Sequence, residues 1–106
     1  MERPNGYIDT DSVDTESFKQ VMLKRTKIII YEHSFENNRL YLQLLRGFID
    51  VSVFLHCIRI NYASYSKNIK DGLECGFIDA NTASRACNEL EKNKEFYEKK
   101  GLDYNG

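Results

Sequence analysis

The sequence predicts an all-α domain in which a long central helix packs against two flanking helices. Pro4 and six glycines are the only strong helix breakers in 106 residues, which favours helix throughout. Apolar residues also recur at alternating steps of four and three from 44 to 69, the spacing of a helix that packs against other helices. These eight seam positions are Leu44, Phe48, Val51, Leu55, Ile58, Tyr62, Tyr65 and Ile69.

A flexible acidic leader is predicted for residues 1–13, because Pro4 and Gly6 are followed there by a run of acids and hydroxyls. The first helix is predicted over about 15–33, with Asp14 or Thr15 as its N-cap. A short connection at 33–35 then leads into the central helix.

The central helix is predicted over about 36–75. Gly47 lies inside it, at a cost of about 1 kcal/mol relative to Ala. Gly76 suits the left-handed position that follows a helix end. No internal repeat is apparent.

The third helix is predicted over about 80–99, with Asp79 as its N-cap. Its apolar side is formed by Ala83, Cys87, Leu90 and Tyr97. Gly101 is expected to end the helix, which leaves 14–101 as the single helical domain and 102–106 as a frayed tail.

An α+β fold is the alternative, with strands near 26–32 and 48–60. Three consecutive isoleucines at 28–30 are β-branched, and residues 49–57 alternate between apolar and polar. Phe54 falls on the wrong side of that alternation, however, and the phase changes at Ile58. The four-three pattern continues over 26 residues, so helix is favoured.

The cysteine count and the hydropathy indicate a cytoplasmic protein. Three cysteines form an odd set without a CxxC pair, which favours a reducing compartment. The acidic first residues lack the apolar run of a signal peptide. The uncharged stretch from Val51 to Ile58 is far shorter than the roughly 20 residues that a membrane span needs.

No constellation of residues predicts catalysis. His56 and Cys57 are adjacent, and adjacent side chains on a helix point about 100° apart, so they cannot form a nucleophile and base pair. The histidines and cysteines lack metal-site spacing, and no glycine-rich phosphate loop is present. We therefore expect no enzyme activity, metal, cofactor or small-molecule substrate.

A surplus apolar surface predicts a small helical protein–protein interaction module. Apolar residues interrupt the polar back of the central helix, and two flanking helices cover only about two of its sides. A second copy, giving a homodimer, or another protein would cover the rest, as in a regulator, inhibitor, immunity protein or chaperone. The predicted partner-binding residues are Val53, Phe54, Cys57, Tyr41, Tyr62 and Tyr65.

Nucleic-acid binding is the alternative function. Residues 17–33 carry a formal charge of +3, which is modest for a nucleic-acid-binding arm, and they follow an acidic segment, 1–16, of charge −4. The candidate contacts are Lys19, Lys24, Arg25, Lys27 and Arg39.

Overall fold

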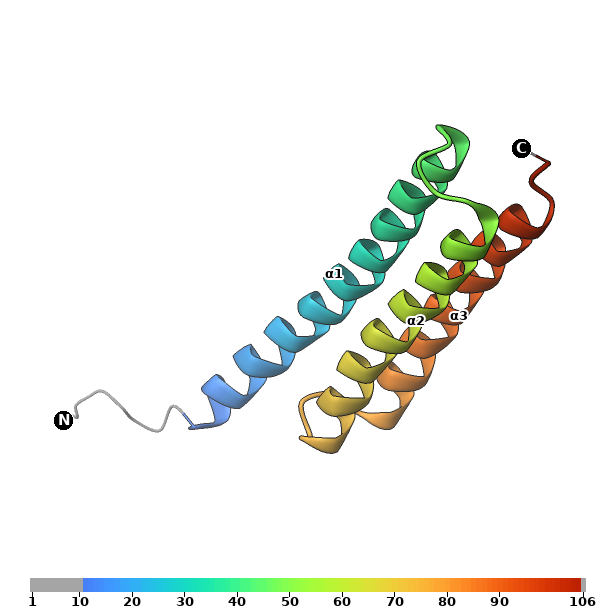
Figure 1. Cartoon of the computed structure of the whole chain (residues 1–106). Coiled ribbons are helices and arrows are strands. Elements are labelled where there is room, and N and C mark those ends of the chain that lie inside the picture. The colour runs from blue at the N-terminus through green and yellow to red at the C-terminus, as the bar shows by residue number, and fades with distance from the viewer. Residues whose placement is uncertain (1–10, 106) are drawn as a thin grey trace.

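The computed structural model describes the backbone of residues 11–105 and the side chains of residues 17–105. The described chain folds into three helices (Figure 1). They are α1 (Asp11–Leu45), α2 (Val51–Glu74) and α3 (Ala80–Leu102). Residues 11–105 contain no strand, so the predicted all-α three-helix fold is confirmed and the α+β alternative is not. The leader predicted for 1–13 lies mostly outside the described residues, but 11–13 already belong to α1.

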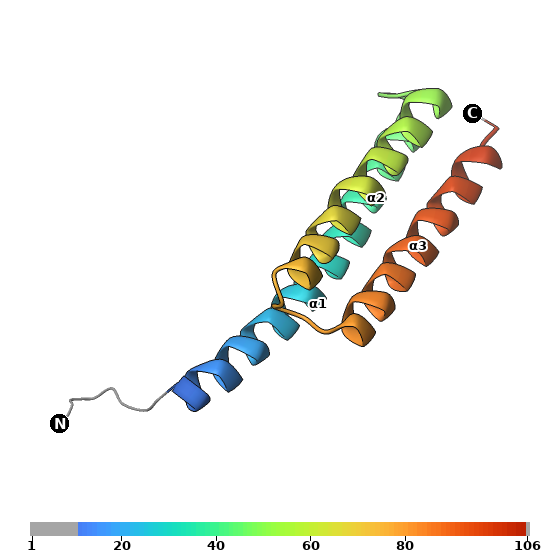
Figure 2. The ribbon, with the colours of Figure 1, turned by 90° about the horizontal axis from the view of Figure 1, so that it is seen from below.

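Helices α2 and α3 form an antiparallel hairpin, and α1 lies along both of them (Figures 1 and 2). The N-terminal end of α1 extends past the turn that joins α2 to α3. Phe18 marks the level of that turn, because its ring packs edge-on against Phe77 with 5.0 Å between the ring centroids.

The predicted boundary between the first and central helices is wrong. α1 continues through 33–35 to Leu45, and the chain breaks at 46–50 instead. Gly47 has φ of +78°, a conformation that side chains other than glycine rarely adopt. The Phe48 N–H donates to the Gln43 carbonyl at 2.9 Å and the Gly47 N–H to the Leu44 carbonyl at 3.1 Å, which completes a Schellman motif.

The second turn repeats the first, residue for residue. The sequence Gly-Phe-Ile-Asp occurs at 47–50 and again at 76–79, and Gly76 also has φ of +78°. In both turns the aspartate caps the next helix: Asp50 accepts from the Val53 N–H at 2.8 Å and Asp79 from the Thr82 N–H at 2.7 Å. The predicted cap at Asp79 is confirmed. The prediction of no internal repeat overlooks this repeated turn sequence.

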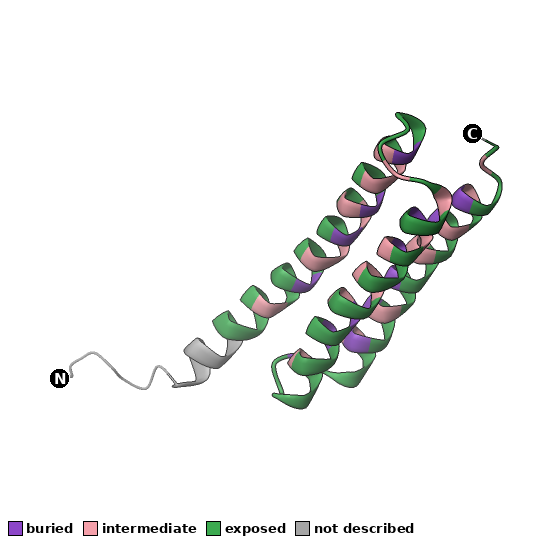
Figure 3. Ribbon diagram, viewed as in Figure 1, coloured by how far each residue is buried: buried purple, intermediate pink, exposed green. Residues whose placement is uncertain are grey.

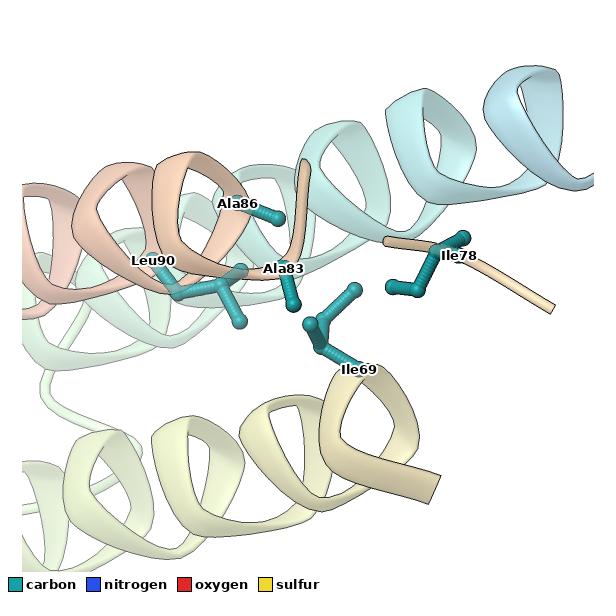
Figure 4. Close-up of a cluster of buried hydrophobic side chains, with 5 residues drawn as sticks. All are labelled: Ile69, Ile78, Ala83, Ala86 and Leu90. Carbon is teal, nitrogen blue, oxygen red and sulfur yellow. The ribbon is translucent and has the colours of Figure 1, made fainter. Parts of the chain in front are cut away.

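The core consists of two apolar clusters, and Figure 3 shows the buried residues on the sides of the helices that face one another. The cluster near the second turn is drawn in Figure 4 and contains Ile69, Ile78, Ala83, Ala86 and Leu90. The cluster near the first turn contains Leu44, Phe54, Ile58 and Tyr97. Three of the eight predicted seam positions, Leu44, Ile58 and Ile69, are buried in these clusters.

The end of α3 also differs from the prediction. Gly101 is buried within the helix, where an added Cβ would lie 2.7 Å from two carbons of the Phe54 ring. The missing side chain therefore makes room for Phe54 and does not end the helix. Beyond α3, Tyr104 packs against the cluster at the first turn, so the predicted frayed tail contributes to the core.

Candidate functional site

α1 exposes a row of apolar side chains on the side opposite its core face. Thr26, His33, Asn37 and Leu44 are buried and mark the core face. A second series with three-four spacing runs along the opposite side, since residues on a helix are separated by about 100°. We call this series the outer stripe; its apolar members are Val21, Ile28, Tyr31, Phe35, Leu42 and Leu45, all exposed.

The outer stripe runs along most of the helix, and two polar residues interrupt it. Lys24 and Asn38 occupy the remaining positions of the same spacing. Asn38 Oδ1 accepts a hydrogen bond from the Tyr97 hydroxyl at 3.2 Å, so the stripe borders α3 at this position. Near its middle, the Tyr31 and Phe35 rings stack with 6.4 Å between their centroids and 19° between their planes. These two side chains are 69% and 52% exposed, so a large aromatic surface faces away from the bundle.

Exposed apolar residues on the other two helices form shorter series than the outer stripe. On α2, Val53, Cys57 and Ile60 lie on one side, and Ser64 and Lys67 end this series after two turns. On α3, Phe96 lies between Lys92 and Lys99 at helical spacing. Single exposed apolar residues are normal on protein surfaces, whereas a contiguous apolar patch marks an interaction site. The outer stripe of α1 is therefore the candidate functional site.

A groove between α1 and α2 adjoins the stripe near the N-terminal end of α1. A cavity of about 210 Å³ is lined there by apolar residues that include Met22, Ile29 and Ile69, and by polar residues that include Arg25 and Asp71. An adjoining hollow of about 360 Å³ is lined by the stripe residues Val21 and Ile28 together with the polar Lys24, Arg25, Glu32 and Asn68. The stripe thus continues into a concave surface that side chains of a partner can fill.

The predicted partner-binding residues do not form one surface. Phe54 is 0% exposed, so the prediction that it faces outward is wrong. Its ring lies in the core, 6.1 Å from Tyr41 between ring centroids. The error has a physical cause: the seam was extended through Gly47, and the core face of α2 is instead set by Phe54, Ile58, Ser66 and Ile69.

The other predicted partner-binding residues are divided between the surface and the edges of the core. Val53 is exposed, and Cys57 is half-buried. The half-buried Tyr41 packs against Tyr97 as well as Phe54. Tyr62 and Tyr65 are also half-buried and place their rings against His33. Most of this set therefore contributes to packing between the helices.

The predicted nucleic-acid contacts all lie on α1 and are all exposed. They surround the outer stripe instead of forming one basic surface, because Arg25 and Lys27 are about 200° apart around the helix. Lys24 lies within the stripe, and Arg39 forms an ion pair with Glu36 at 3.4 Å. Lys19 lies near the second turn, where it lines a hollow with Asp79. The cations are therefore mixed with apolar side chains along the helix.

A layer of asparagines separates the two apolar clusters, with one residue from each helix. Asn37 donates to the Asn93 amide oxygen at 2.8 Å and accepts from the Asn61 amide at 3.2 Å. Asn93 in turn donates to Ser34 Oγ at 3.2 Å. The sequence prediction did not include this layer, although the signal is present: Asn37 falls at core spacing between His33 and Leu44.

His33 lies beside the asparagine layer and is 0% exposed. Asn37 Nδ2 is 3.3 Å from His33 Nε2, so Nε2 acts as the acceptor and Nδ1 carries the proton. Among the described residues Nδ1 has no hydrogen-bond partner. Burial disfavours the charged imidazolium and lowers the pKa of His33 from 6.5 to about 4.

The described part of the chain contains no group of three or more His, Cys, Asp or Glu residues placed to hold a metal ion. Cys57, Cys75 and Cys87 are free thiols. Of the helices that the structure describes, none has the length and apolar character needed to cross a membrane.

Comparison with protein-family models, curated protein sequences and solved structures gives no match to this chain.

Proposed function

We propose that this chain is a small helical interaction module that binds another protein through the outer stripe of α1. The row of six exposed apolar side chains on that helix is the observation that carries the proposal. A helix with apolar residues on two opposite sides needs cover on both, and α2 and α3 cover one. Roles as a regulator, inhibitor, immunity protein or chaperone all agree with this mode of action.

The stripe offers enough apolar surface to support specific binding. Full burial of one large apolar side chain contributes about 1.5–3 kcal/mol, and the six apolar stripe residues are about half exposed. Covering them contributes on the order of 5–9 kcal/mol, which opposes the cost of association. Tyr31 and Phe35 are the expected centre of the binding energy, since aromatic residues are enriched among binding hot spots.

We also propose that the protein acts by binding alone, without catalysis, in a reducing cytoplasmic compartment. The buried His33 lies against the uncharged side chains of Asn37, Tyr62 and Tyr65. The three free thiols agree with a reducing environment.

A matched pair of substitutions tests the proposed binding surface. Phe35 on the stripe and Phe96 on α3 are 52% and 54% exposed, so replacing either with aspartate removes a similar exposed ring. The wild-type chain is used to capture binding proteins from cells that make it. Each captured protein is then purified, and its affinity for the wild-type chain and for both variants is measured by titration. We expect Phe35→Asp to weaken binding of the partner at least tenfold and Phe96→Asp to leave it unchanged. Equal binding by both variants would contradict the proposal.

Nucleic-acid binding is the second candidate, because exposed cations accompany the stripe along α1. It predicts binding to duplex DNA that weakens steeply with salt and with Lys24→Glu and Arg25→Glu. An absence of binding at about 50 mM salt, where phosphate contacts are strong, would eliminate it.

A further inference from the structure

We infer that the protein bound by the outer stripe is a second copy of this chain, with the two α1 helices packed antiparallel and the two-fold axis crossing the stripe at the level of residue 33. The inference rests on the proposed function, because it names the occupant of the same surface. It is carried by a property of the stripe that binding to an unrelated protein does not require: the stripe is complementary to itself.

The eight stripe positions fit the core of a two-helix coiled coil. Val21, Ile28, Phe35 and Leu42 fall at a positions, and Lys24, Tyr31, Asn38 and Leu45 fall at d positions. In an antiparallel pair, each a residue packs beside a d residue of the other copy. All eight stripe positions have a partner when the two residue numbers in each layer add to 66. The layers are then Val21 with Leu45, Lys24 with Leu42, Ile28 with Asn38, and Tyr31 with Phe35.

This pairing places two-fold symmetric aromatic layers at the centre of the interface. Tyr31 and Phe35 of each copy meet their counterparts on either side of residue 33. The exposed fractions of the two rings leave about 200–300 Å² accessible in each copy. With four aliphatic residues and the stems of flanking cations, the stripe approaches the roughly 800 Å² per partner of a standard interface. A shift of the register by one heptad would leave stripe residues uncovered.

Lys24 favours the antiparallel arrangement over the parallel one. A parallel pair places Lys24 against Lys24 of the second copy in the same layer. In the antiparallel pair Lys24 lies beside Leu42, where its stem covers apolar surface while the ammonium reaches water. The helix dipoles also oppose one another in this arrangement. Residues 17–45 carry more cations than acids, so screening by salt should strengthen the dimer.

Sedimentation equilibrium across the micromolar range tests the inference. We expect the wild-type chain and Phe96→Asp to form dimers, and Phe35→Asp to raise the dimer dissociation constant at least tenfold with unchanged helix content by circular dichroism. We also expect the wild-type dimer to tighten as salt increases. A wild-type chain that stays monomeric at all concentrations would overturn the inference. If such a monomer still binds a different protein through Phe35, the proposed function stands and only the second copy is rejected.

Site-specific crosslinking tests the direction of packing. Val21→Cys and Leu45→Cys are made in a background in which Cys57, Cys75 and Cys87 are alanine, and a short bismaleimide is added. In the antiparallel pair, residue 21 lies about 36 Å from its own counterpart along the helix but beside residue 45 of the second copy. We therefore expect covalent dimers only when the two variants are mixed. Crosslinking of either variant alone would overturn the antiparallel arrangement.

Discussion

At the scale of single residues, His33 makes the stability of the bundle depend on pH. In the unfolded chain it takes up a proton near pH 6.5, whereas burial holds its pKa in the folded chain at about 4. The unfolded state therefore binds more protons than the folded state between these two values. The contribution of His33 to the free energy of unfolding is therefore fully present above pH 6.5 and is lost as the pH falls toward 4.

Urea unfolding at pH 7.5 and pH 4.5 measures this effect. The difference between the two pKa values predicts that His33 removes about 2–3 kcal/mol from the free energy of unfolding at the lower pH. His33→Met places an uncharged, apolar side chain in the site and should remove the part of the stability loss that comes from protonation of His33. The exposed His56 provides the control, and His56→Gln should lose as much stability as the wild type. A His33→Met variant with the full loss would assign the effect to another group.

At the scale of the elements, the asparagine layer fixes how the three helices are aligned. The layer gains modest energy from its hydrogen bonds, but any other alignment buries asparagines without partners. The apolar clusters alone specify alignment less strictly, because aliphatic side chains pack in several ways. We expect the layer to contribute more to a single register than to total stability.

Single and triple substitutions separate these two contributions. Asn37→Leu alone leaves Asn61 and Asn93 without their shared partner and should lower the free energy of unfolding by about 1–3 kcal/mol. Replacing all three asparagines with leucine should restore or raise stability. The triple variant should also broaden the amide resonances in two-dimensional NMR, because several registers become populated. A triple variant that is less stable than Asn37→Leu, or that keeps sharp resonances, would contradict this role.

The elements that were predicted from the sequence are those with local signals. Gly76 and Asp79 bound the second turn, and both were identified from residue type and position. The first turn carries the same Gly-Phe-Ile-Asp sequence but was missed, because Leu44, Phe48 and Val51 continue an apolar spacing across it. The last part of α1 and the whole of α2 are thereby joined in the prediction, and the first helix ends too early in it.

The candidate site was predicted less well, for a different reason. α1 has apolar residues at helical spacing on two opposite sides, so periodicity alone does not say which side faces the hairpin. That choice is made by contacts far apart in the sequence, such as those from Asn37 to Asn61 and Asn93. The sequence prediction places the surplus apolar surface at Phe54 on α2, which is buried, whereas Phe35 on α1 is exposed.

At the scale of the whole molecule, the three helices differ in how much of their surface the fold covers. α1 has 35 residues, against 24 in α2 and 23 in α3. It contributes one side to the core and leaves the other side as a nearly straight apolar edge. The proposed dimer joins two bundles along these edges, so each folded chain is stabilised by the other.

The thermal midpoint should therefore depend on protein concentration. A partner that binds only the folded chain raises its stability by mass action, so the wild-type midpoint should rise as the protein is concentrated. Phe35→Asp should show a lower midpoint that is independent of concentration, and Phe96→Asp should follow the wild type. Differential scanning calorimetry over a wide concentration range provides the measurement. A constant wild-type midpoint would show that folding and association are not coupled.

The position of α1 at the start of the fold also matters while the protein is being made. α1 leaves the ribosome before the hairpin that covers its core face, and synthesis of residues 46–102 takes about 3–12 s at common rates. During that interval both apolar sides of the helix face water. Two nascent chains on one messenger RNA would then be able to pair through α1 before either bundle is complete.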